Sequence, residues 1–191
     1  MSEGEEHARL VSQAASGDAA AFREFVLRHV DGVHRIVLGH VGREEAEDAT
    51  QEVFLRVHQG LKGFKGRSRV TTWLYRIATN VGLKRRRRRR WSFRRAEREL
   101  AERADDRPGP DALVADRERC ERVARAVSSL PAELRSVVIL RGYEELSWGE
   151  IAEILEIGVS TAEARMARAK EQLRSLLTSG MSDEIREGKD P

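Results

Sequence analysis

The chain has 191 residues, of which 35% are charged and 5% aromatic, and its formal net charge is +3. Its one cysteine, Cys120, excludes an internal disulfide and a cysteine-based metal site. No apolar run approaches the ~20 residues that span a bilayer, and the acidic start lacks the features of a secretory signal. We therefore expect a cytoplasmic, all-α protein without membrane insertion, with no indicated metal or cofactor.

The first 60 residues predict three helices. Two lie within residues 8–40 and are separated at residues 16–18, where Asp18 is well placed to cap the second. The third covers residues 44–59, because its alanines and valines recur at helical spacing and form an apolar stripe. Acidic and amide side chains are expected to face outward from this helix, at Glu47, Asp48, Gln51 and Glu52.

A basic loop over residues 62–69 should lead into a helix over 72–90, with Thr71 or Thr72 as its N-cap. The apolar stripe of this helix leaves Trp73, Arg76, Asn80 and Lys84 on the opposite side. A tryptophan beside cations and an amide suggests a platform on which unpaired bases stack while the cations contact phosphates. The alternative is a core position for Trp73, packed on Phe54 or Leu61.

The positive charge is concentrated in one segment. Residues 84–95 carry nine basic and no acidic residues, so the rest of the chain sums to about −6 by subtraction from +3. One segment thus supplies the whole positive excess, which indicates a localised anionic partner. The alternative is a disordered segment that adds charge without sequence selectivity.

Residues 94–115 have the composition of a flexible linker, because their prolines cannot continue a helix. The linker would join a helical domain over residues 1–93 to a second helical domain over residues 116–177. The polar residues 178–191 are expected to form a disordered tail.

The end of the second domain predicts a helix-turn-helix. Ser147 should cap a helix over 147–155, and residues 156–158 should form the turn to a helix over 160–177. Small Ala152 would let the two helices approach, and the second helix would enter the major groove of DNA. An ordinary amphipathic helix pair is the alternative. The outward positions of the second helix are Thr161, Ala164, Arg165 and Arg168.

Taken together, the motifs resemble bacterial RNA polymerase sigma factors of the extracytoplasmic-function (ECF) type. The acidic helix, the Trp73 helix and the basic run resemble the promoter-melting domain of this family. The resemblance continues upstream and downstream in the family's order and covers most of residues 10–177. The segments that carry it are residues 17–22, 47–54, 72–80, 130–135 and 146–155.

The resemblance implies roles for particular residues. Core RNA polymerase would bind the acidic helix at Asp48, Gln51, Glu52 and Phe54. The single strand of the −10-like element would be held by Phe64, Lys65, Arg67, Arg69, Thr72, Trp73, Arg76 and Asn80. Phosphates of the upstream duplex would contact Lys84, Arg85, Arg86, Arg87 and Arg88. The −35-like element would be read by Ser160, Thr161, Ala164, Arg165 and Arg168.

The family likeness also implies a protein with no catalytic residues, a monomer when free, and a cognate anti-sigma factor that masks these surfaces until a signal arrives. Three positions depart from the family pattern. Glu156 stands where glycine is usual, so a left-handed backbone there would cost about 1 kcal/mol. Ala162 and Glu163 replace a Val-Lys pair, and the Glu163 carboxylate would repel phosphates.

Other functions are weighed against this one. An enzyme is disfavoured because the five histidines lack metal-ligand spacing and no phosphate loop or nucleophile motif occurs. A stand-alone helix-turn-helix regulator explains residues 130–177 but leaves the acidic helix and the Trp73 face without a role. A basic RNA-binding or nucleoid protein explains only the arginine run. Specific initiation that requires core polymerase distinguishes a sigma factor from both.

Overall fold

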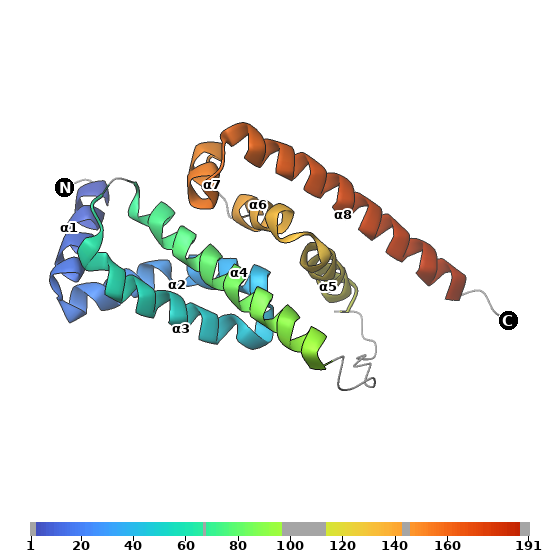
Figure 1. Cartoon of the computed structure of the whole chain (residues 1–191), viewed down its shortest axis with the longest axis horizontal. Helices are drawn as coiled ribbons and strands as arrows, with labels where there is room; N and C mark the ends of the chain where they lie inside the picture. Colours follow the sequence, from blue (N-terminus) through green and yellow to red (C-terminus); the bar gives the residue numbers. More distant parts are fainter. Residues whose placement is uncertain (1–2, 67, 97–113, 143–145, 188–191) are drawn as a thin grey trace.

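The computed structural model describes residues 3–66, 68–96, 114–142 and 146–187. Within these ranges every regular element is helical, as the composition predicts. Eight α-helices and one 3-10 turn follow one another, and Figure 1 shows their arrangement. They are α1 (Glu3–Ser16), α2 (Ala19–Val41), α3 (Arg43–Gly60), η1 (Leu61–Gly63), α4 (Val70–Ala96), α5 (Val114–Ser129), α6 (Ala132–Gly142), α7 (Trp148–Leu155) and α8 (Val159–Glu187).

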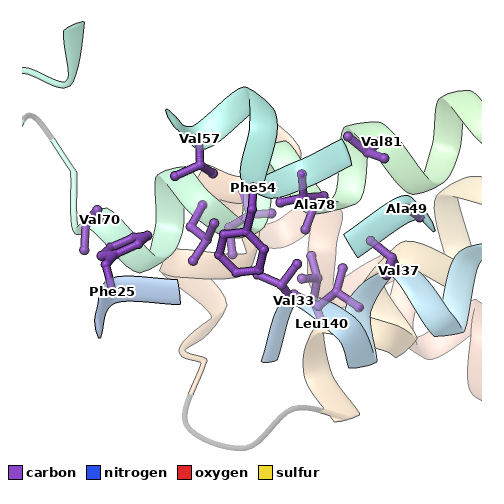
Figure 2. Packing of buried hydrophobic residues seen from close by; sticks show 14 of the residues in the cluster. Phe25, Val33, Val37, Ala49, Phe54, Val57, Val70, Ala78, Val81 and Leu140 are labelled. Carbon is purple, nitrogen blue, oxygen red and sulfur yellow. The ribbon is translucent and has the colours of Figure 1, made fainter. Parts of the chain in front are cut away.

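Helices α1 to α4 form an N-terminal bundle in which α2 packs against the other three. As predicted, Asp18 caps α2, because its Oδ1 accepts hydrogen bonds from the backbone N–H groups of Ala20 (2.8 Å) and Ala21 (3.1 Å). Phe25 and Val57 are completely buried between the helices (Figure 2). Burying one such large apolar side chain contributes about 2 kcal/mol, so this interior holds the four helices together.

Helix α4 begins earlier and ends later than the sequence predicts. The backbone N–H of Trp73 donates to the carbonyl of Arg69 (3.1 Å), so the helix has started before Thr71 and Thr72. Neither threonine is therefore its N-cap, and that prediction is wrong. At the other end, α4 continues to Ala96, because arginine is a good helix former and several arginines of the run have partners on neighbouring helices.

The C-terminal domain contains the predicted helix-turn-helix, formed by α7 and α8. Ser147 caps α7 in a capping box with Glu150, as the sequence indicates. Glu156 has φ 55° and ψ 45°, and it is the only non-glycine residue with positive φ in the described ranges. The prediction of a left-handed backbone at Glu156 is confirmed. The turn it makes brings the buried side chains of Ile151 and Ala162 together.

The last helix is longer than predicted. We expected it to end at residue 177 and a disordered tail to follow, but α8 continues to Glu187. No proline interrupts this stretch, and the Thr178 hydroxyl donates to the carbonyl of Arg174 (2.9 Å) in the preceding turn. Helix α5 also begins inside the predicted linker, at Val114, and most of that linker (97–113) lies outside the described residues.

The two domains pack directly against each other. Helix α4 contacts α7, and α2 contacts α5 and α6 (Figure 1). Leu140 of α6 belongs to the same apolar cluster as Val33 and Val37 of α2 (Figure 2). Gly39 allows this close approach, because a Cβ atom there would lie 2.8 Å from Cγ1 of Ile139. The structure therefore has a closed arrangement of two domains, which the linker composition alone did not predict.

Candidate nucleic-acid and polymerase interfaces

The predicted polymerase-binding residues lie on α3 but not on one surface. Asp48 and Gln51 are exposed, and Glu52 is half-buried. Phe54 is only 9% exposed and belongs to the apolar core. Its neighbour Leu55 is 65% exposed and shares the outward face, one helical turn beyond Gln51 and Glu52. The i, i+3, i+7 spacing from Asp48 to Leu55 is the signal that could have identified Leu55 from the sequence.

Glu52 also holds the basic part of α4. The Nε of Arg85 donates to Glu52 Oε2 (2.6 Å), and Arg56, one turn along α3, donates to Oε1. Partial burial raises the pKa of Glu52, but the Arg85 hydrogen bond and the neighbouring charges outweigh it, so the pKa is lowered overall. Glu52 therefore stays ionised and links α3 to α4.

The arginine run is divided between two faces of α4. On the inner face, Arg85 binds Glu52, while Arg86 and Arg89 donate to the carbonyls of His40 (3.3 Å) and Val41 (3.2 Å). These carbonyls end α2, where the helix offers no further N–H partner. Two of the five predicted phosphate contacts, Arg85 and Arg86, therefore have partners within the bundle.

The outer face of the same segment is solvent-exposed. Lys84, Arg87 and Arg88 are exposed there, and Trp91, one turn further along, is 78% exposed. We refer to these four residues as the outer stripe. Trp91 was not among the residues predicted from the sequence, although the spacing 84, 87, 88, 91 places it on this face. The outer stripe combines three cations with an aromatic ring, as surfaces that bind nucleic acid do.

The predicted single-strand face lies at the start of α4 and in the loop before it. The rings of Phe64 and Trp73 lie 5.3 Å apart between centroids, both half-buried. Trp73 also packs on Gly60 and against the apolar core. Its ring is therefore partly a core side chain, as the alternative predicted, and partly open to solvent, as a stacking platform requires. Lys65 and Arg69 are exposed and Asn80 is exposed further along α4, whereas Thr72 is only 1% exposed. Arg67 lies outside the described residues.

Two cations of this face contact the other domain. The Nη1 of Arg69 lies 2.9 Å from Glu150 Oε1 on α7. The Nη2 of Arg76 donates to the backbone carbonyl of Glu153 (2.8 Å), and its Nη1 lies 3.5 Å from Glu156 Oε1. The hydrogen bond from the Ser147 backbone is the main cause that lowers the pKa of Glu150, and Arg69 adds to it. The single-strand face is thus partly occupied by the helix-turn-helix.

The predicted duplex-reading face of α8 is largely open. Ser160, Thr161, Ala164 and Arg168 are exposed. Arg165 is half-buried, with its Nη2 3.2 Å from Glu133 Oε2 on α6. Of the two departures at the start of this helix, Ala162 is completely buried, while Glu163 is exposed. Ala162 therefore affects packing only, and Glu163 is the position where an anion would meet DNA phosphates.

Two histidines, His29 and His40, are buried within the N-terminal domain. Burial is the main cause that lowers the pKa of His40 to about 3 and that of His29 to about 4. The positive charges of Arg135 and Arg86 add to the effect on His40. Within the described ranges no group of three or more His, Cys, Asp or Glu side chains could hold a metal ion. No helix in those ranges is long and apolar enough to span a membrane.

Both domains match known family models. Residues 25–92 match sigma-70 region 2, and residues 120–173 match sigma-70 region 4. The chain is 32% identical over 179 residues to ECF RNA polymerase sigma factor SigW of Bacillus subtilis, covering 87% of this chain and 94% of that one. It is 33% identical over 178 residues to ECF RNA polymerase sigma-E factor of Escherichia coli, covering 86% and 90% of the two chains.

Solved structures give the same fold. CnrH, solved in complex with the cytosolic domain of CnrY, superposes with a TM-score of 0.65 and 26% identity, over 89% of this chain and 96% of the other. The sigma factor RpoE of Bartonella quintana, solved with the anti-sigma factor NepR, superposes with a TM-score of 0.63 and 22% identity, over 82% and 96%. The second likeness concerns the fold alone.

Proposed function

Because the chain belongs to the ECF family of RNA polymerase sigma factors, we propose that it directs core RNA polymerase to a particular set of promoters and helps to open them. It would have no chemistry of its own. The N-terminal domain would bind the polymerase and the −10-like element, and the helix-turn-helix would read the −35-like element. The alternative, a helix-turn-helix regulator that acts without polymerase, leaves the N-terminal domain without a role.

The observation that carries this proposal is the arrangement of α4. Its first turns carry Trp73, Arg76 and Asn80, and its later turns carry the outer stripe. One rigid helix can thereby hold an unpaired strand at one end and duplex phosphates at the other. Stacking of a base on an aromatic side chain contributes about 1–3 kcal/mol. That is comparable with the few kcal/mol needed to unpair a base, so the Trp73 face can help to trap open DNA.

The acidic face of α3 would bind core polymerase. Asp48 and Gln51 offer exposed hydrogen-bonding groups, and Leu55, exposed one turn further along the same face, offers apolar surface. Carboxylates suit a basic partner, because charge-assisted hydrogen bonds to arginine are stronger than neutral ones. Glu52 would take part only by sharing its carboxylate with Arg85 and Arg56. Phe54 would support this face from the core.

The helix-turn-helix would bind DNA more weakly and more selectively than the N-terminal domain does. Ser160, Thr161, Ala164 and Arg168 would face the major groove, and Arg168 could grip a guanine edge or a phosphate in two places. Glu163 would repel the backbone nearby, so the reading helix would favour one docking position over others. An anti-sigma factor, such as the one solved with RpoE of Bartonella quintana, would be the inhibitory partner.

The experiment that tests the proposal is multi-round transcription with purified core polymerase, this protein and fragments of its source genome. Start sites that require both components, and that share upstream sequences, are expected. The variant Asn80→Ala should reduce open-complex formation, while Lys170→Ala, exposed on α8 outside the assigned positions, should not. Sequence-selective DNA binding without polymerase, combined with no transcripts when polymerase is present, would instead support the stand-alone regulator.

A further inference from the structure

The contact between α4 and α7 brings opposite charges together across the domain boundary. Arg69 pairs with Glu150 (2.9 Å), and Arg76 contacts both Glu153 and Glu156. The Arg76 guanidinium also donates to the Glu153 backbone carbonyl (2.8 Å). Both arginines are among the residues assigned above to the single strand. The helix-turn-helix therefore presents carboxylates where the proposed function places phosphates.

The acidic side chains are arranged for this contact by α7 itself. Glu150, Glu153 and Glu156 are spaced three residues apart, so they lie along one side of the helix and its C-cap. One oxygen of Glu150 is fixed by the capping box, where it accepts from the Ser147 N–H (2.8 Å). The other oxygen of the same carboxylate faces Arg69. The cap thus orients Glu150 independently of the N-terminal domain, which carries Arg69.

Glu156 supplies a second, independent observation. Its backbone is left-handed, a conformation that glycine would adopt more easily. The side chain of Glu156 nevertheless reaches Arg76, with Oε1 3.5 Å from Nη1. A glycine at this turn would make the same bend and provide no carboxylate. Glu156, which departs from the family pattern, therefore adds one of the charge pairs between the domains.

We propose that the acidic side of α7 is an internal competitor of single-stranded DNA, which holds Arg69 and Arg76 in the free protein and keeps the two domains closed. Polymerase or DNA would separate the domains and release both arginines. The competition rests on the proposed function, because it takes these arginines as contacts to the single strand. The domain contact itself does not depend on that assignment.

Apolar packing cooperates with these charges. Ile139 lies against Gly39, and Leu140 enters the cluster of the first domain. The ion pairs are partly exposed, so salt screens them, with a Debye length of about 8 Å at physiological ionic strength. Raising the salt concentration should therefore open the domains, while it also weakens contacts to DNA. Because the two effects oppose each other, the affinity of the free protein for single-stranded DNA should fall less steeply with salt than the number of its DNA-contacting cations predicts.

The test measures domain separation and strand binding on the same full-length protein. Dyes on Gln59→Cys and Gln172→Cys, both exposed, report the distance between α3 and α8 by energy transfer in a Cys120→Ser background. Binding is measured by anisotropy with a short single-stranded oligonucleotide. The key variant is Glu153→Gln/Glu156→Gln, which leaves the Glu150 cap intact. The matched control, Asp31→Asn/Glu171→Gln, removes two exposed charges, one from α2 and one from α8, at positions outside the assigned interfaces and outside the α4–α7 contact.

We expect lower energy transfer and roughly fivefold tighter oligonucleotide binding for Glu153→Gln/Glu156→Gln, with little change for the control. Gly39→Val should lower energy transfer without altering any charge, because its side chain would collide with Ile139. Unchanged energy transfer in the Glu153→Gln/Glu156→Gln variant would overturn the proposal that these carboxylates keep the two domains closed. Lower transfer with unchanged oligonucleotide binding would overturn the competition, and with it the assignment of Arg76 to the strand, but would leave the family function intact.

Discussion

Arg85 on α4 and Glu52 on α3 form an ion pair of 2.6 Å, half-buried between the two helices. The sequence assigned one of these residues to DNA and the other to polymerase. In the structure they hold the N-terminal bundle together, and the neighbouring Lys84, Arg87 and Arg88 remain exposed. Basic residues adjacent in sequence therefore have different tasks, because a helix turns each one about 100° from the last.

The first prediction separates the two faces of the arginine run. Arg87→Gln should weaken binding to duplex DNA and make the log–log salt slope shallower by about 0.9, because one phosphate contact is lost. Arg85→Gln should leave the slope nearly unchanged but lower the midpoint of thermal unfolding, because Glu52 loses the partner that links it to α4 and keeps only Arg56 of its own helix. Filter binding at several salt concentrations measures the slope, and calorimetry measures the unfolding midpoint. Equal slopes for Arg85→Gln and Arg87→Gln would contradict the division into two faces.

The second prediction concerns Trp91. Because its side chain is 78% exposed, Trp91→Ala should leave thermal stability within about 0.5 kcal/mol of the wild type. If the ring contacts nucleic acid, DNA affinity should fall by about 1 kcal/mol, or roughly fivefold. A protein with Trp73→Phe and Trp148→Phe keeps Trp91 as its only tryptophan, and its fluorescence should change on DNA titration. An unchanged spectrum at saturating DNA would remove Trp91 from the interface.

The third prediction contrasts two neighbours on α3. Leu55→Ala should weaken binding to core polymerase and leave stability unchanged, because Leu55 is 65% exposed. Phe54→Ala should cost about 3–5 kcal/mol of stability, because the ring lies in the core. Chemical denaturation and polymerase pull-down distinguish the two outcomes. A Leu55→Ala protein with full polymerase affinity would show that this face binds through its polar groups alone.

The fourth prediction is a loss of stability in acid. The pKa of His40 is about 3 in the folded protein and 6.5 in the unfolded chain, so the fold favours the neutral ring. His29, at about 4, behaves similarly. The contribution of each is complete above pH 6.5 and is lost as the pH falls toward the folded value. Between the folded pKa and pH 6.5, the free energy of unfolding should fall by about 1.4 kcal/mol per pH unit for each histidine.

Urea unfolding between pH 7 and pH 4.5 measures this slope. His40→Leu should flatten it, because one of the two titrating rings is removed. Val37→Ala, which weakens the same helix without a titratable group, should lower stability by the same amount at every pH. If the unfolding free energy of His40→Leu depends on pH as steeply as that of Val37→Ala, the fold does not lower the pKa of His40.

The fifth prediction concerns the turn of the helix-turn-helix. Glu156→Gly should raise the stability of the full chain by roughly 0.5–1 kcal/mol, because a left-handed non-glycine residue is strained. The exposed pair with Arg76 contributes little to set against that gain. Glu156→Gln keeps the strain and should have a stability near that of the wild type. A Glu156→Gly protein no more stable than Glu156→Gln, which also lacks the carboxylate, would show that the left-handed backbone at this position is not strained.

The sequence by itself determined the local elements and the family. Helical periodicity, the Asp18 and Ser147 caps and the left-handed Glu156 depend on interactions within a few residues, which a sequence displays directly. Its errors were also local: the start of α4 was placed at a threonine because that residue type often caps helices, although the chain had already turned at Arg69.

Only the tertiary structure decided which functional side chains are available. Phe54 and Thr72 face the core, Arg85 binds Glu52, and Arg76 binds α7, although each stands at a position that the family resemblance assigned to a partner. These outcomes depend on contacts between residues 33 to 77 positions apart in the chain. Spacing along one helix fixes a face, whereas the packing of other helices decides whether that face meets solvent, the core or the second domain.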